Sequence, residues 1–101
     1  MNSLNSVILE GEVISRKETL SEGVSRFNFT VASYRTTKDV NGKQIEVITE
    51  VPCIAYGCLA ENVKKYATLG RGICEVGRLS GSEGQLSLTV EYVEYKGGLL
   101  C

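Results

Sequence analysis

The sequence predicts a single all-β domain, a five-stranded barrel with one helix between its third and fourth strands. Five segments alternate apolar and polar residues with the period of a β-strand. Only residues 58–69 show helical spacing, and they follow the third of these segments. A chain of 101 residues is long enough to bury a core without a metal or a disulfide, so we treat residues 1–101 as one domain.

The first predicted strand covers residues 7–15, which are mostly apolar and contain Gly11. A glycine inside a strand often marks a bend or a bulge, and a small barrel needs such a bend to close. The polar residues 16–22 that follow predict a loop.

The second predicted strand opens at Gly23 and has a clear alternation. Phe27 and Phe29 fall on the face expected to line the core, and Tyr34 falls on the opposite face. The polar stretch after this strand contains Asn41-Gly42, a pair typical of tight hairpin turns. We therefore expect a hairpin between the second and third strands.

The third strand is predicted over residues 45–56. Pro52 has no N–H to donate to a neighbouring strand, so we expect this stretch at a sheet edge or a bulge. Alternation places one set of side chains on a common face: Glu46, Ile48, Glu50, Pro52, Ile54 and Tyr56.

The helical segment, residues 58–69, is long enough to close one end of a barrel. Gly70 is a natural stop for it. Its apolar stripe is formed by Leu59, Val63 and Tyr66.

The last two strands are predicted over residues 71–79 and 85–95, joined by the short turn 80–84. Three strands, one helix and two strands, at this length, are the arrangement of the OB fold. Residues 96–101 are expected to form a flexible tail. Alternation places four side chains of the fifth strand on one face: Leu86, Leu88, Val90 and Tyr92.

Composition argues against catalysis. The chain has no histidine, so it lacks both the usual catalytic base and the commonest metal ligand. It also lacks a glycine-rich phosphate loop and a recognisable nucleophile with its base, so we expect neither an enzyme nor a cofactor. The net charge of −1 neither demands nor excludes a nucleic-acid partner.

The four cysteines show no C-x-x-C spacing, so neither a zinc site nor a redox motif is expected. Cys53, Cys58 and Cys74 are expected to be small, half-buried apolar residues. No segment has the length of a membrane span or the pattern of a signal peptide, and we expect a cytoplasmic setting.

One stretch is more specific than the strand pattern: Tyr56-Gly57-Cys58-Leu59-Ala60-Glu61-Asn62-Val63, followed by Lys65-Tyr66 and Gly77-Arg78-Leu79. With Asn5-Ser6-Val7-Ile8-Leu9-Glu10-Gly11 and Phe29-Thr30-Val31-Ala32-Ser33-Tyr34-Arg35, it resembles the bacterial single-stranded DNA-binding proteins. The likeness runs from Asn5 to Tyr95 with the motifs in the same order. It implies an OB barrel that binds single-stranded DNA without sequence preference, acts as a homodimer or homotetramer, and serves DNA replication, recombination or repair.

In such proteins bases stack on exposed aromatic rings, and basic side chains follow the phosphates. The resemblance implies a stacking role for Tyr56. Tyr34 matches no stacking position of the family, but its outward side and its place beside Arg35 make it a candidate substitute. The candidate phosphate contacts are Arg35, Lys38 and Lys43 around the hairpin, and Arg71 and Arg78 on the fourth strand.

The chain also departs from the family. Glu50 stands where the family carries a stacking aromatic, Thr37 stands near another such position, and the turn 80–84 offers no aromatic. At ~1–3 kcal/mol for each stacked base, three losses amount to roughly 3–9 kcal/mol, so we expect weaker binding than in the family. The family's acidic C-terminal tail has no counterpart in this sequence.

Two alternatives follow from these departures. One is an accessory OB protein of the primosomal replication protein N type, which combines DNA contact with recognition of replication proteins. The other is an OB module for protein interaction with little affinity for DNA. Glu10, Glu12, Glu50 and the nearly neutral net charge favour the latter.

Overall fold

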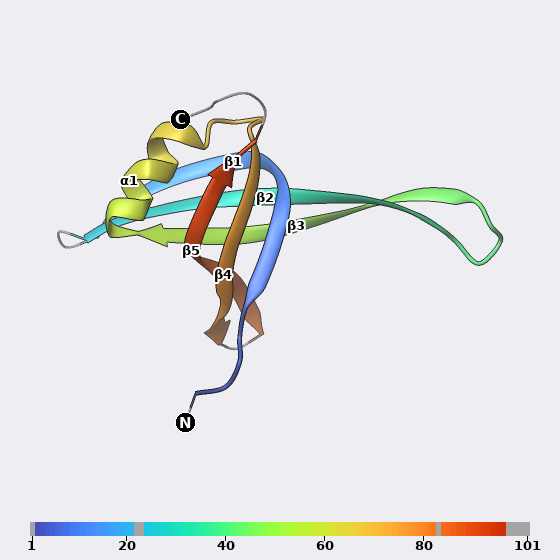
Figure 1. Ribbon diagram of the computed structural model, residues 1–101, viewed down its shortest axis with the longest axis horizontal. Coiled ribbons are helices and arrows are strands. Elements are labelled where there is room, and N and C mark those ends of the chain that lie inside the picture. Colours follow the sequence, from blue (N-terminus) through green and yellow to red (C-terminus); the bar gives the residue numbers. More distant parts are fainter. Residues whose placement is uncertain (1, 22–23, 83, 97–101) are drawn as a thin grey trace.

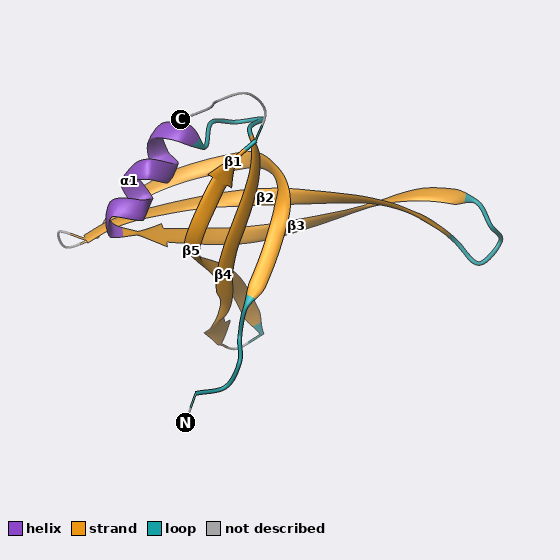
Figure 2. Cartoon of the chain, viewed as in Figure 1, coloured by secondary structure: helices purple, strands orange, loops and turns teal. Residues whose placement is uncertain are grey.

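The computed structural model describes residues 2–21, 24–82 and 84–96 and forms the expected closed barrel, with its strands in the order β1-β2-β3-β5-β4 (Figure 1). The elements are β1 (Val7–Ser21), β2 (Val24–Lys38), β3 (Gln44–Tyr56), α1 (Gly57–Tyr66), β4 (Gly72–Ser82) and β5 (Gln85–Tyr95). Figure 2 shows the single helix beside a body made of strands. Most of the expected tail, residues 97–101, lies outside the described residues, as does Gly23. Lys96 is tied to the barrel, since its backbone N–H donates to the carbonyl of Gly72 over 2.9 Å.

Strand β1 is longer than predicted, and the loop expected at residues 16–22 is wrong for residues 16–21. The first half of β1 pairs with β4, and the second half pairs antiparallel with β2, from Glu12 to Ser21. Lys17 and Glu18 in this second half are exposed, so a polar sequence satisfies the strand as well as a loop.

Two different features bend β1. Gly11 lies against β2, where an added Cβ would come within 2.2 Å of the carbonyl oxygen of Ala32. The bulge predicted at this glycine instead lies at Ile14, which is skipped between the partners of Val13 and Ser15. The close approach and the bulge together turn the strand from β4 to β2.

Helix α1 covers one end of the barrel and packs against β2, β3 and β5 (Figure 1). It buries Ala60 and Val63, and it ends at Tyr66, three residues before the predicted end. Leu69 is 66% exposed and lies beyond the helix. Within the described residues, no helix is both long and apolar enough to cross a membrane. The core shared by α1 and the barrel comprises Val13, Phe27, Phe29, Val31, Cys53, Ala55, Ala60, Val63, Ala67, Ile73, Leu88 and Val90.

The predicted face of β5 is only partly right. Leu88 and Val90 are buried, whereas Leu86 is 58% exposed and Tyr92 is 55% exposed. Val90 pairs with Gly77 and Tyr92 pairs with Val76. Gly77 and Val76 are consecutive on β4, so Glu91 has no partner there and forms a bulge in β5. An extra residue reverses the side-chain alternation, and Tyr92 therefore lies on the outside.

Strands β2 and β3 continue past the barrel as a two-stranded arm, which projects from the body in Figure 1. The arm closes at the predicted Asn41-Gly42, where Gly42 has a φ of 80°. Asp39 Oδ1 accepts hydrogen bonds from the backbone N–H groups of Asn41 and Lys43, both at 2.9 Å. On the barrel, β3 pairs with β5 only at Cys53 and Ile54, so Pro52 lies beside an unpaired edge as predicted.

Candidate nucleic-acid interface

An exposed tyrosine with an arginine beside it lies at the end of β3. Tyr56 is 45% exposed and is the direct cross-strand partner of Arg26 on β2. The Arg26 guanidinium carbon lies 6.0 Å from the centroid of the Tyr56 ring, and Arg26 Nε donates a 3.4 Å hydrogen bond to Oδ1 of Asn28. The exposed ring thus has a positive charge beside it, and a stacked base with its phosphate requires both features.

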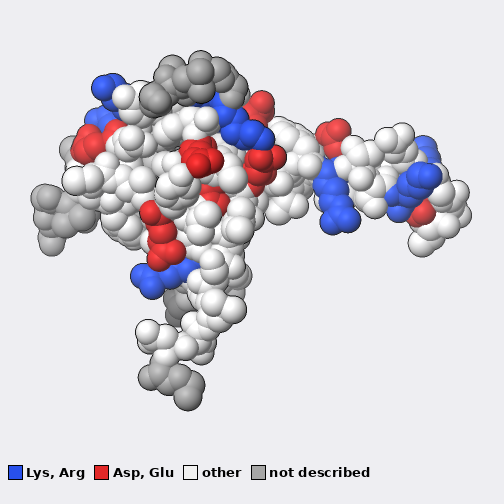
Figure 3. All heavy atoms as spheres, viewed as in Figure 1, with Lys and Arg blue, Asp and Glu red and all other residues white. Residues whose placement is uncertain are grey.

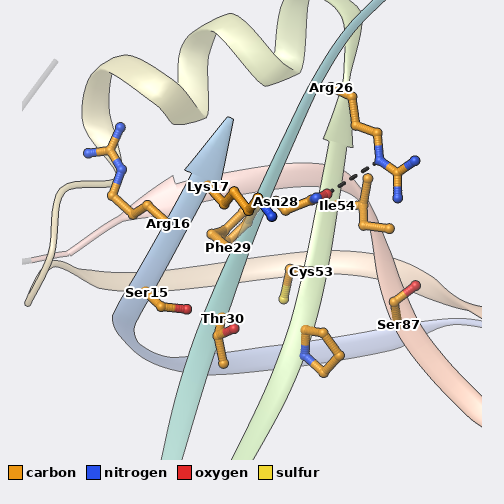
Figure 4. A pocket seen from close by; sticks show the side chains of 11 residues that line it. Ser15, Arg16, Lys17, Arg26, Asn28, Phe29, Thr30, Cys53, Ile54 and Ser87 are labelled. Carbon is orange, nitrogen blue, oxygen red and sulfur yellow. Dashed lines mark hydrogen bonds between the residues drawn. The ribbon is translucent and has the colours of Figure 1, made fainter. Parts of the chain in front are cut away.

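Next to this pair is a cavity of about 360 Å³, shown from close by in Figure 4. Its walls come from β1, β2, β3 and β5. The chain has 12 acidic and 11 basic residues, yet none of the described residues lining this cavity is acidic. Such a lining favours an anionic ligand. The lining comprises the cations Arg16, Lys17 and Arg26, the polar residues Ser15, Asn28, Thr30 and Ser87, and the apolar residues Phe29, Pro52, Cys53 and Ile54.

The three cations that line the cavity differ in the contacts that they make with the rest of the protein. The Arg16 guanidinium lies 5.0 Å from the centroid of the Phe27 ring and donates a hydrogen bond to the carbonyl of Lys64, so it ties β1 to α1. Lys17 is exposed and makes no ion pair within the described part of the chain. Lys17 and Arg26 are therefore the cations that a ligand can reach without breaking the contact between β1 and α1.

Tyr34 is exposed, as predicted, but it lies in acidic surroundings. Its hydroxyl donates a 3.3 Å hydrogen bond to Oε1 of Glu12. Desolvation and the negative charges of Glu12, Glu46 and Glu50 raise the pKa of the Tyr34 phenol. These charges repel a phosphate that approaches the ring, so we expect Tyr34 to be a poorer stacking platform than Tyr56.

The three predicted cations of the arm do not form one patch with Tyr56. Arg35 pairs with Val47 and Lys38 pairs with Gln44, and strand alternation puts these two cations on opposite faces of the arm. Lys43 follows the turn at the tip. Figure 3 shows Lys and Arg atoms along the arm at a distance from the barrel body.

The two predicted cations at the end of the chain lie elsewhere on the barrel. Arg71 precedes β4, its Nε donates to the carbonyl of Lys96 over 3.0 Å, and its guanidinium lies 5.4 Å from the Tyr95 ring centroid. Arg78 is exposed on β4 and lines a second cavity, with Asn5 and Glu91. Because β4 pairs only with β1 and β5, Arg78 does not adjoin the pair formed by Tyr56 and Arg26. The Arg71 side chain is held at Lys96 and Tyr95.

Sequence reasoning missed Lys17 and Arg26. Lys17 falls in the predicted loop 16–22, and a loop gives its side chain no defined direction. Arg26 could have been found, because it alternates with the core residues Phe27 and Phe29 and therefore points outward beside Asn28.

A buried acid lies in the core behind the cavity. Glu75 on β4 is 0% exposed and accepts a 2.8 Å hydrogen bond from Sγ of Cys53, while its Oε2 has no hydrogen-bond partner among the described residues. Burial raises the pKa of Glu75 to about 7. Burial and the neighbouring carboxylate also raise the pKa of the Cys53 thiol. Cys58 and Cys74 are also expected to be half-buried, which holds for Cys74, whereas Cys58 is exposed.

No cluster of three or more His, Cys, Asp or Glu side chains suited to a metal ion occurs among the described residues. The candidate site is therefore a binding surface of one aromatic ring, two accessible cations and an acid-free cavity.

Comparison with known families gives one match, to the model described as the Single-strand binding protein family, over residues 4–91. No curated protein sequence matches the chain significantly. The matched region includes β1, β2, β3, α1, β4 and the first part of β5. It therefore contains every described residue that lines the cavity.

Several solved structures share the fold. A deletion mutant of the single-stranded DNA binding protein from Thermus aquaticus has a TM-score of 0.79 and 21% identity over 94% of this chain, and the chain spans 51% of that protein. A Plasmodium falciparum SSB in complex with single-stranded DNA has a TM-score of 0.82 and 17% identity, covering 96% of this chain and 98% of that one. The protein priB from Ralstonia solanacearum has a TM-score of 0.77 and 15% identity, covering 94% and 100%. At these identities the likeness establishes the fold.

Proposed function

The chain belongs to the single-strand binding protein family, and from this premise we propose that it binds single-stranded DNA, largely without regard to sequence. The observation that carries the proposal is the exposed Tyr56 ring with Arg26 beside it, at the rim of a cavity without acidic lining residues. OB folds bind oligonucleotides on the face of their second and third strands, where this cavity opens. Members of the family are non-enzymatic DNA-binding proteins, and we assign no catalytic activity to the chain.

Binding on this surface combines one stacked base with a short run of phosphate contacts. A base stacks on Tyr56, and Arg26 and Lys17 contact the phosphates next to it. Glu50 and the acids around Tyr34 limit how far the strand extends along β2 and β3. We therefore expect binding weaker than a surface with several stacking rings gives.

The test is a fluorescence anisotropy titration of labelled oligo-dT at two or more salt concentrations. With the two phosphate contacts made by Arg26 and Lys17, the log–log dependence of affinity on salt has a slope of about −1.4. Absence of binding at low salt contradicts the proposal.

We propose that the chain acts as a homodimer or homotetramer in DNA replication, recombination or repair. An exposed apolar row on the outer face of the barrel supports self-association. Ile8 on β1 is 75% exposed, its β4 partner Val76 is half-buried, and Val76 pairs in turn with Tyr92, which is 55% exposed. A contiguous exposed row of this kind is typical of a protein–protein contact.

A second candidate function is protein interaction with little DNA affinity, as in an accessory OB protein of replication. The acidic surroundings of Tyr34, formed by Glu12, Glu46 and Glu50, favour it. A protein that binds a replication partner but leaves oligo-dT free at low salt supports this second function and excludes the first.

A further inference from the structure

Resting on the proposed binding of single-stranded DNA, we infer that the cavity beside Tyr56 is a subsite for one whole nucleotide, next to the base that stacks on the ring. The base of this nucleotide lies against Pro52 and Ile54, and Lys17 and Arg26 contact the phosphates on its two sides. The surface therefore holds two neighbouring nucleotides in different ways, one stacked on an aromatic ring and one inserted in a cavity.

The size and construction of the cavity suit a single nucleotide. Its volume of about 360 Å³ is at the small end of the range of small-molecule sites, ~300–1,000 Å³. Its walls are strand residues of four different strands, so its shape is fixed by the barrel and not by a loop (Figure 4). Rigid walls of this kind lower the cost of ordering a bound group.

The chemistry of the lining divides between the two parts of a nucleotide. Lys17 and Arg26 supply positive charge at the rim, and no acid competes with a phosphate for them among the described lining residues. Half-buried Ile54 and exposed Pro52 offer an aliphatic surface to the flat face of a base. The hydroxyl of Ser87 can donate to or accept from the edge of the base.

Spacing along β3 connects this subsite to the stacking ring. Ile54 and Tyr56 are two residues apart on the same face, which is about 6.6 Å along a strand. Bases stacked in one DNA strand are about 3.4 Å apart. The two positions therefore fit neighbouring bases that are pulled out of their mutual stack, as in an extended single strand.

The test compares two fluorescent probes of equal length, about 12 nucleotides, which is within the 4–16 nucleotides that an OB fold occupies. One probe is oligo-dT, and the other has the same sugar–phosphate backbone without bases. Ile54→Thr removes the apolar wall and keeps a β-branched residue in the strand, whereas Lys17→Ala removes the cation. Lys65→Ala, on the exposed side of α1, is the matched control for loss of one positive charge.

We expect Ile54→Thr to bind oligo-dT about 3- to 10-fold more weakly than the wild type and to bind the base-free probe unchanged. Lys17→Ala is expected to weaken binding of both probes and to reduce the salt slope by about 0.7, the value for one phosphate contact of a single strand. Lys65→Ala is expected to match the wild type. Thermal melting of each variant checks that it is folded. Lys17 is exposed, so we expect Lys17→Ala to melt as the wild type does.

Three results overturn the inference, and they differ from one another. If the wild type does not bind oligo-dT, the proposed function and the subsite both fail. If the wild type binds and Tyr56→Ala weakens binding, while Ile54→Thr and Lys17→Ala behave as Lys65→Ala does, only the subsite fails. If Lys17→Ala alone weakens binding, the cavity rim holds a phosphate without an inserted base, and the whole-nucleotide subsite is wrong.

Discussion

Arg26 and Tyr56 face each other across β2 and β3, with the guanidinium carbon 6.0 Å from the ring centroid. A base stacked on this ring gains π contact with Tyr56 and lies within reach of the positive charge. We predict that Tyr56→Ala weakens binding of oligo-dT by ~1–3 kcal/mol, or about 5- to 150-fold. Tyr56→Phe keeps the ring and is expected to bind nearly as the wild type. Equal affinities of the alanine variant and the wild type in an anisotropy titration contradict the stacking role.

Arg26 is expected to act on the phosphates. Arg26→Ala should lower the affinity for oligo-dT at low salt and make the salt slope shallower by about 0.7. Arg26→Lys keeps the charge and should retain most of the slope. Arg78→Ala is the matched control, because Arg78 is exposed on β4, which does not pair with β2 or β3. A loss of affinity in the Arg78 variant equal to that in Arg26→Ala places the phosphate path elsewhere on the barrel.

The acids near Tyr34 should oppose binding. Glu50→Gln removes one negative charge from the outer face of β3 and is expected to raise the affinity for oligo-dT by up to about 1 kcal/mol, or five-fold, at low salt. Salt screens exposed charges, so the gain should fade as ionic strength rises. Tyr34→Ala is expected to weaken binding less than Tyr56→Ala does. A larger loss at Tyr34 than at Tyr56, in titrations run side by side, makes Tyr34 the main platform.

The succession of strands and helix along the chain and the core role of Phe27 and Phe29 could be predicted from the sequence, because each depends on a local hydrophobic period. The second half of β1 could not. Its polar residues form a strand only because β2 supplies their hydrogen-bond partners, and this pairing is part of the tertiary structure. Lys17 was missed for the same reason, since a loop gives its side chain no defined direction.

A bulge explains why the predicted face of Tyr92 on β5 is wrong. The extra residue Glu91 reverses the alternation of β5, so Tyr92 lies outside although Leu88 and Val90 lie inside. A bulge is set by the way two strands fit together, and the single sequence carries no clear mark of it. The burial of Glu75 could not be predicted either, because no hydrophobic pattern predicts a carboxylate at the centre of a core.

The exposed row of Ile8 and Tyr92 predicts the assembly state. Ile8→Glu places a charge on the proposed self-association face, where burial against another copy would cost its solvation. We expect the wild type to have the solution mass of a dimer or tetramer and the variant to have that of a smaller species, by light scattering after size exclusion. Leu69→Glu, at an apolar residue 66% exposed beyond α1, is the matched control and should leave the mass unchanged. A monomeric wild type contradicts the proposed oligomer.

Glu75 predicts how stability depends on pH. Its pKa is about 7 in the folded protein, where burial disfavours the charged form, and 4.5 when unperturbed. Between these values the folded protein holds a proton that the unfolded chain releases, so the free energy of unfolding falls as pH rises. The contribution is complete below about pH 4.5 and is lost as pH rises through about 7. The gap between the two pKa values corresponds to about 3 kcal/mol.

Glu75→Gln isolates this contribution, because glutamine can still accept the hydrogen bond from Cys53 but carries no charge at any pH. Urea unfolding followed by circular dichroism, at several pH values from 4 to about 8, gives the free energy of unfolding of both proteins. We expect the wild type to lose about 3 kcal/mol relative to Glu75→Gln across this range. Cys53→Val removes a hydrogen bond that lowers the pKa of Glu75, so it should move the loss to still higher pH. Parallel pH curves for the wild type and Glu75→Gln contradict the raised pKa, since the two proteins differ in this one titrating group.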